Sequence, residues 1–125
     1  STPSNSSAAS DVYKRQISHG VWIRASDGHT IFDNESKNVL NCPESGIQIG
    51  EHCWICMNTT ILKDSNIPRN SVLAAGAIYS KSSNPRDGRT NCIFAGIPAK
   101  VIRENIDWDR RHTYDYDLQQ KDGAR

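Results

Sequence analysis

The sequence has few of the features that mark membrane proteins or nucleic-acid-binding proteins. Its 125 residues contain no apolar run near the roughly 20 residues that cross a bilayer, so we expect no membrane span. The formal net charge is only +1, which gives no electrostatic reason to expect nucleic acid as a partner. Aromatic residues are also scarce, at 7%, so a core must be built mainly from aliphatic side chains.

Cysteine is scarce as well, with four in the chain. Cys53 and Cys56 form a CxxC pair, but a single pair without a second pair or a suitably spaced histidine is a weak zinc signal. We favour a structural role for both over a metal site or a disulfide, and predict no metal. Because no signal peptide is visible, we expect reduced thiols and a cytoplasmic location.

The first sixteen residues look foreign to the rest of the chain. The segment SSAASDVYKRQ, residues 6–16, resembles the translation of a transposase-type sequencing-library adapter. A natural, disordered Ser-rich arm is the alternative. We interpret residues 1–16 as an adapter-derived segment and expect the authentic chain to start near Ile17, with an N-terminal part missing.

The stretch from residue 49 to residue 84 repeats every six residues. Divided into hexads, it reads IGEHCW, ICMNTT, ILKDSN, IPRNSV, LAAGAI and YSKSSN. The first place of each hexad holds a large residue: Ile49, Ile55, Ile61, Ile67, Leu73 and Tyr79. The fifth place is always small: Cys53, Thr59, Ser65, Ser71, Ala77 and Ser83. Neither the period of a helix nor that of a flat strand explains this spacing.

The six-residue period predicts an all-β fold, a parallel β-helix in which each hexad forms one short strand and three strands complete a coil. The large first residue would fill the axis, and the small fifth residue would lie where the chain turns a corner. An antiparallel β-sandwich is the alternative, but no Asp-Gly hairpin signal falls within the six hexads. Ile17, Ile23 and Ile93 extend the register, so we expect the β-helix domain to span residues 17–104.

Two polar segments interrupt the register. Residues 33–46 are predicted to leave the helix as a loop and to rejoin it, and residues 82–90 contain a proline and an Asp-Gly pair, which are typical of a surface turn. The register ends after Lys100, and we expect residues 105–125 to form a tail with a short helix or an extended segment. The apolar residues expected to pack this end of the chain on the β-helix are Val101, Ile102, Ile106 and Trp108.

Three segments resemble the hexapeptide-repeat acyltransferases, whose fold is a left-handed parallel β-helix. In chain order they are IRASDGHTIFD, HCWICMNTTILKDSNIPRNSVLAAGAIYSK and AGIPAKVIR. The first is similar to the active-site segment of members that O-acetylate sugars, with the bacterial surface-polysaccharide acetyltransferases as the most similar subgroup. Cys56 and Pro68 stand where the family usually has Gly, and Ser80 where it has Thr; the register stays intact.

The resemblance implies transfer of an acetyl group from acetyl-CoA to a sugar hydroxyl. A base must take the proton of that hydroxyl, and histidine suits this task near neutral pH. Of the four histidines only His29 lies in a matched motif, at the first place of a hexad; we predict that it is the general base, with a structural histidine as the alternative. Asp27 or Asp33 would orient His29 or bind the sugar, or else be a solvated loop carboxylate.

The resemblance also implies contacts with both substrates. Trp54 would border the cleft, where its ring could hold a sugar or the pantetheine arm; a purely structural tryptophan is the alternative. The contacts implied for acetyl-CoA are Met57 and Ala75 along the pantetheine, Ser80 and Lys81 beside them, and Lys100 and Arg103 at the phosphates. A solvated basic surface is the alternative for the last two.

In this family the cleft forms between the subunits of a homotrimer, with the sugar or polysaccharide acceptor on one side. Other functions stay open. A γ-class carbonic anhydrase would need three zinc histidines on facing coils, which the histidine spacing does not supply. A non-catalytic β-helix would keep the hexads without needing SDGH or AGIPAK. An acetyltransferase for a small sugar or a xenobiotic would differ only in its acceptor.

Overall fold

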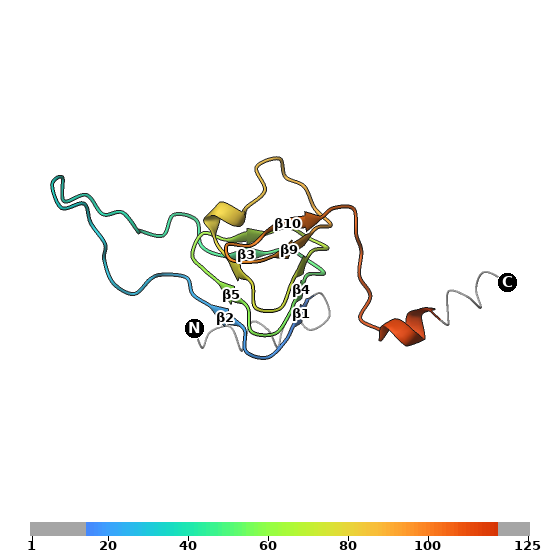
Figure 1. Cartoon of the computed structure of the whole chain (residues 1–125). Helices are drawn as coiled ribbons and strands as arrows, with labels where there is room; N and C mark the ends of the chain where they lie inside the picture. Colours follow the sequence, from blue (N-terminus) through green and yellow to red (C-terminus); the bar gives the residue numbers. More distant parts are fainter. Residues whose placement is uncertain (1–14, 118–125) are drawn as a thin grey trace.

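The computed structural model describes residues 15–117, which form a left-handed parallel β-helix with two excursions and a C-terminal tail (Figure 1). The prediction of a parallel β-helix is confirmed. The strands are β1 Gln16–Ile17, β2 Trp22–Ile23, β3 Gln48–Ile49, β4 Trp54–Ile55, β5 Thr60–Ile61, β6 Asn66–Ile67, β7 Val72–Leu73, β8 Ile78–Tyr79, β9 Ile93–Ala95 and β10 Lys100–Arg103. A 3₁₀ turn, η1, spans Lys81–Ser83, and residues 113–117 are helical. No helix of the described part is long and apolar enough to cross a membrane.

The strands stack into three sheets, one for each side of the coil. Sheet A has the order β1-β4-β7-β9-β10, sheet B the order β2-β5-β8, and sheet C pairs β3 with β6. In the regular part each residue pairs with the residue 18 positions later, so that Trp54 lies beside Val72 and Thr60 beside Ile78. Three hexads therefore complete one coil, and each coil hydrogen-bonds to its neighbouring coils.

The large first residue and the small fifth residue of each hexad have the roles that the period predicts. The first-place residues Ile55, Ile61, Ile67, Leu73 and Tyr79 are fully buried along the axis, and so are the fifth-place residues Cys53, Thr59 and Ser71. Tyr79 fits an aliphatic row because its hydroxyl donates to the carbonyl oxygen of Asn66 at 2.8 Å. Burial raises the pKa of this hydroxyl well above its usual value, so it remains a donor.

The fourth place of the hexad has a role that the sequence reasoning missed. The residues there have φ between +55° and +75°, in the left-handed region: Gly20, Gly46, His52, Asn58, Asp64, Asn70 and Gly76. Glycine, asparagine and aspartate tolerate this region better than other residues. A Cβ at Gly20 would lie 2.3 Å from Oδ1 of Asn58, so a larger residue at this first corner would also have to displace the Asn58 side chain.

The first excursion is a long arm between β2 and β3, which extends away from the body of the helix (Figure 1). Its two sides meet at an antiparallel bridge between Phe32 and Val39. The sequence predicts a loop from residue 33, but the chain leaves the helix directly after Ile23. His29 therefore lies exposed on the arm, and its expected first-place position in a hexad is wrong.

The second excursion follows β8 and replaces the third strand of its coil. Sheet C consequently ends at β6, where the Asn84 side chain stands in for a strand: its Oδ1 accepts the amide hydrogen of Asn66 at 2.6 Å, and its Nδ2 donates to the carbonyl oxygen of Asp64 at 2.9 Å. Val72 pairs with Ile93, 21 positions later. This turn is thus three residues longer than a regular coil.

The chain ends by folding back on sheet A. β10 runs antiparallel to β9, and the tail after it packs on the helix through two of the residues predicted to do so. Ile106 exchanges hydrogen bonds with Asn91, and Trp108 stacks on the His52 ring with centroids 4.1 Å apart. β1 begins at Gln16, so the boundary predicted between residues 16 and 17 falls inside a strand. The adapter-like residues 1–14 and the end of the tail, 118–125, lie outside the described residues.

Candidate active site

Four of the residues implied by the resemblance lie at the corners that flank sheet B: Met57, Ala75, Ser80 and Lys81. The side chains on the outer face of this sheet are Trp22, Thr60 and Ile78, one from each strand. Met57 and Ala75 lie on the corner that precedes β5 and β8, where the Met57 carbonyl oxygen accepts the amide hydrogen of Gly76 at 3.1 Å. Both side chains are exposed. The predicted pantetheine contacts therefore stack above one another along one edge of the face.

The opposite edge carries Ser80 and Lys81, which follow β8. The Ser80 hydroxyl lies 2.9 Å from the Ser82 hydroxyl, and Lys81 Nζ lies 3.0 Å from a carboxylate oxygen of Glu44. The Lys81–Glu44 pair is exposed, so it contributes little stability and leaves the lysine able to exchange partners. Ser80 and Lys81 are thus placed across sheet B from Met57 and Ala75.

The arm that carries His29 is tied to this edge at its root. Asp27 accepts hydrogen bonds from Lys63 Nζ and from Asn41 Nδ2, each at 2.9 Å. The same Asn41 Nδ2 also donates to the carbonyl oxygen of His29, at 2.9 Å. The hydrogen bond from Lys63, followed by that from Asn41, lowers the pKa of Asp27, so this carboxylate stays charged and holds the two sides of the arm together.

The imidazole of His29 is exposed and makes no hydrogen bond with the described residues. Asp27 fixes its backbone through Asn41 but does not contact its ring. Asp33 accepts the amide hydrogens of Glu35 and Ser36 at 3.0 and 2.8 Å. These bonds lower the pKa of Asp33, and the bond from Ser36 has the larger effect. Asp33 therefore closes the turn at the tip of the arm, and Asp27 is the carboxylate nearer to His29 along the chain.

Trp54 lies on a different side of the β-helix from the arm. It is on β4 in sheet A, 39% exposed, with its ring tilted against Trp108 at a centroid distance of 5.9 Å. Trp108 in turn donates its indole N–H to the carbonyl oxygen of His52 at 2.6 Å. Within one chain, the structure thus does not bring Trp54 to His29.

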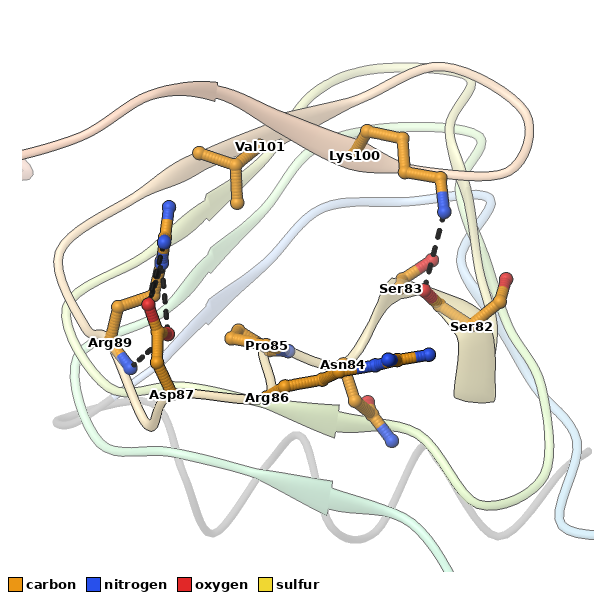
Figure 2. Close-up of a pocket in the computed structure, with 9 residues that line it drawn as sticks. All are labelled: Ser82, Ser83, Asn84, Pro85, Arg86, Asp87, Arg89, Lys100 and Val101. Atoms are coloured by element: carbon orange, nitrogen blue, oxygen red, sulfur yellow. Dashed lines mark hydrogen bonds and ion pairs between the residues drawn. The ribbon is translucent and has the colours of Figure 1, made fainter.

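Lys100 reaches a cavity of about 280 Å³ at the second excursion (Figure 2). The cavity is lined by residues 82–87, by Arg89, and by Lys100 and Val101 of β10. Lys100 Nζ donates to the carbonyl oxygen of Ser82 at 3.3 Å, which places it next to the Ser80–Lys81 edge. Arg103 is exposed at the end of the same strand. Ser80, Lys81 and Lys100 are therefore brought together, with Arg103 three residues further along β10.

The thiols and the acidic side chains do not form a metal site in the described part of the chain. No three His, Cys, Asp or Glu side chains there are close enough to hold an ion. All four cysteines are free, and burial raises the pKa values of Cys53, Cys56 and Cys92. Cys53 is buried at a corner and Cys56 is partly exposed beside it, so the CxxC residues do not face a common ligand.

Sequence reasoning missed the residues that hold the arm root, Asn41 and Lys63. Asn41 gave no signal because it lies in an irregular loop, fourteen positions from its partner Asp27. Lys63 did carry a sequence signal. It lies 18 residues, or one coil, before Lys81, and therefore on the same edge of sheet B.

Comparison with known proteins supports the resemblance. No family model matches the chain. The polysialic acid O-acetyltransferase of Escherichia coli O1:K1 is 39% identical over 94 residues, which are 75% of this chain and 29% of that protein. The galactoside O-acetyltransferase of Escherichia coli K12 is 36% identical over 95 residues, 74% of this chain and 43% of that protein. The chain thus spans less than half of the curated relatives that it matches.

Solved structures agree with the sequence relatives. The crystal structure of the polysialic-acid-specific acetyltransferase NeuO matches 74% of this chain and 37% of its own, with 36% identity and a TM-score of 0.64. That of the polysialic acid O-acetyltransferase OatWY matches 86% of this chain and 50% of its own, with 34% identity and a TM-score of 0.67. Over about three quarters of its length, the chain is therefore similar in sequence and in its left-handed β-helix fold to O-acetyltransferases of the hexapeptide-repeat family.

Proposed function

We propose that the protein transfers an acetyl group from acetyl-CoA to a sugar hydroxyl in a surface polysaccharide. The observation that carries the proposal is the position of His29, exposed on an arm whose root is fixed by Asp27, Asn41 and Lys63 at one edge of sheet B. Its backbone is held by the hydrogen bond from Asn41, and its exposed ring is accessible to a substrate hydroxyl. The homologous acetyltransferases support the same reaction.

The reaction needs one proton acceptor and no covalent intermediate on the protein. The sugar oxygen attacks the thioester carbonyl carbon, the C–S bond breaks, and the hydroxyl proton passes to the neutral imidazole of His29. The imidazolium then returns a proton to the departing CoA thiolate, so that ester and free CoA leave. Cys53, Cys56 and Cys92 lie in the coils. Cys42 is exposed on the arm but lies in no matched catalytic motif, so direct transfer is the simpler mechanism.

The donor would run along sheet B between its two edges. Met57 and Ala75 would contact the pantetheine on one side, and Ser80 and Lys81 would follow on the other. Lys100 and Arg103 would bind the nucleotide phosphates, since both side chains are cationic, exposed and on one strand. We place the protein in the cytoplasm, where reduced thiols and acetyl-CoA occur together.

The substrate cleft is proposed to form between subunits of a homotrimer. His29 and Trp54 lie on different sides of one chain, so a cleft that contains both requires two copies. The arm also exposes a cross-strand apolar cluster, which a second copy would cover: Ile31, Phe32, Val39 and Leu40, each more than half exposed. Measurement of molar mass in solution by light scattering tests this assembly.

An acceptor screen tests the proposed reaction. Acetyl-CoA is supplied with polysialic acid, with a galactoside, or without an acceptor, and released CoA thiol is measured together with the mass of the acetylated product. We expect acceptor-dependent thiol release with a polysaccharide. Acetylation of the galactoside alone would redirect the proposal to a small-sugar acceptor, and CoA binding without any transfer would favour a non-catalytic module.

Replacing Lys100 and Arg103 together by alanine is expected to weaken CoA binding by about 10- to 100-fold, because two charge-assisted contacts with phosphate are lost. Affinity for CoA and for dephospho-CoA is measured by calorimetry. The double change should reduce the affinity for dephospho-CoA less than it reduces the affinity for CoA. Ile102→Ala, an exposed change on the same strand, is the control, and equal CoA affinity before and after the double change would refute the phosphate contacts.

A further inference from the structure

The cavity beside Lys100 contains a second cation that the resemblance does not account for. The excursion that forms the cavity is three residues longer than a regular coil, and it supplies Arg86 and Arg89 to the lining (Figure 2). Asp87 is the only acidic side chain among the lining residues. The two arginines and Lys100 therefore leave the cavity with an excess of positive charge.

Arg89 is already neutralised and has a structural role. Its guanidinium donates to both carboxylate oxygens of Asp87 at 2.6 to 3.0 Å, and its Nη1 pairs with Glu104. The hydrogen bonds from Arg89 lower the pKa of Asp87 to about 2, so this pair stays charged over the whole physiological range. Arg89 thus links the excursion to the end of β10 and is not available to a ligand.

Arg86 differs from Arg89 in having no hydrogen bond or ion pair with any described residue. Figure 2 shows its side chain extended along the cavity toward Ser82, while Lys100 reaches in from β10 and touches the Ser82 carbonyl oxygen. Two cations without an acidic partner among the described residues, Arg86 and Lys100, therefore line one cavity of about 280 Å³, which is large enough for a phosphate group.

We propose that Arg86 and Lys100 together bind a phosphomonoester, and that in the acetyl-CoA-dependent reaction this group is the 3′-phosphate of the donor. The inference rests on the proposed function. A phosphomonoester carries close to two negative charges at neutral pH, which the two cations match, and the planar guanidinium can donate two parallel hydrogen bonds to it. Arg86 would thus give the chain its preference for CoA over forms of the cofactor that lack this phosphate.

Arg86→Ala is expected to weaken CoA binding by about tenfold and to change dephospho-CoA binding less than about twofold, because only CoA has the 3′-phosphate. Both affinities are measured by calorimetry on protein shown to be folded by circular dichroism. Arg86→Lys should recover part of the preference for CoA. Lys37→Ala removes one positive charge from the tip of the arm and serves as the matched control, with both affinities unchanged.

The outcomes separate this inference from the proposed function. If the parent prefers CoA and Arg86→Ala keeps that preference, the role of Arg86 is refuted while the donor assignment stands. If Arg86→Ala weakens CoA and dephospho-CoA equally, the residue does not read the 3′-phosphate and the inference is again refuted. If the parent binds neither compound, the proposed function and the inference fall together.

Discussion

His29→Ala is expected to lower kcat by about 10²- to 10⁴-fold while the affinity for acetyl-CoA stays nearly unchanged. Loss of a general base raises the barrier by about 3–5 kcal/mol, because the sugar hydroxyl then has no positioned group to take its proton. The proposed donor contacts lie on the coils and on β10, whereas His29 lies on the arm. Steady-state kinetics measures the fall in kcat, and a separate binding measurement shows whether the affinity for acetyl-CoA is unchanged.

Stability measurements make this result interpretable. The ring of His29 is exposed and without hydrogen bonds to the described residues, so its removal should change the free energy of unfolding by less than about 0.5 kcal/mol. A loss of activity at unchanged melting temperature therefore indicates chemistry and not folding. His112→Ala, in the tail, is the matched histidine control and should keep full activity.

The pH dependence gives an independent readout. Only a neutral imidazole can accept the proton, so the activity of the parent should be lower in acid than at neutral pH. His29→Ala should lack this dependence. A folded His29→Ala protein with activity within a few-fold of the parent would remove the catalytic assignment, and His52 would be the next candidate to examine.

The coils could be predicted from the sequence because a β-helix repeats locally. Each hexad carries its own information: a large axial residue such as Ile61 and a small corner residue such as Thr59, both fully buried. The stacking of coils then follows from the period alone, without knowledge of distant pairings. The left-handed fourth place is equally periodic, and Asn58, Asp64 and Asn70 would have revealed it.

The excursions could not be predicted in the same way. The arm leaves the helix after Ile23 although the sixfold register continues, by coincidence, to His29. The root of the arm is held by contacts between distant residues, such as Asp27 with Lys63, 36 positions later. The Asn84 side chain that replaces a strand is similarly visible only once β6 is in place beside it.

The site residues divide along the same line. Met57 and Ala75 are 18 residues apart, so the structure stacks them on one edge of sheet B, and Ser80 and Lys81 follow β8 on the other edge. The arm and the second excursion have no such period, and the roles of Asn41 and Arg86 depend on three-dimensional contacts. The sequence could therefore indicate the proposed acetyl-CoA contacts on the coils better than it could indicate the position of His29 and the residues that hold the arm.

Phe94→Ala is expected to lower the free energy of unfolding by about 3–5 kcal/mol. Phe94 lies on β9 at the last coil, fully buried, with its ring edge-to-face against Tyr79 at a centroid distance of 5.2 Å. Its removal deletes the aromatic contact and leaves a cavity where the core ends, with no further coil to close over it. Urea unfolding followed by circular dichroism measures the loss.

Two further variants show whether the loss of stability comes from the cavity at Phe94. Phe94→Leu keeps most of the buried volume and should lose less than half as much as Phe94→Ala. Ile102→Ala removes an apolar side chain from the adjacent strand β10, where it is 64% exposed, and should lose less than about 0.5 kcal/mol. Because β10 pairs with β9 and carries Lys100, Phe94→Ala should also weaken CoA binding. A loss below about 1 kcal/mol for Phe94→Ala would show that the last coil is not part of the cooperative core.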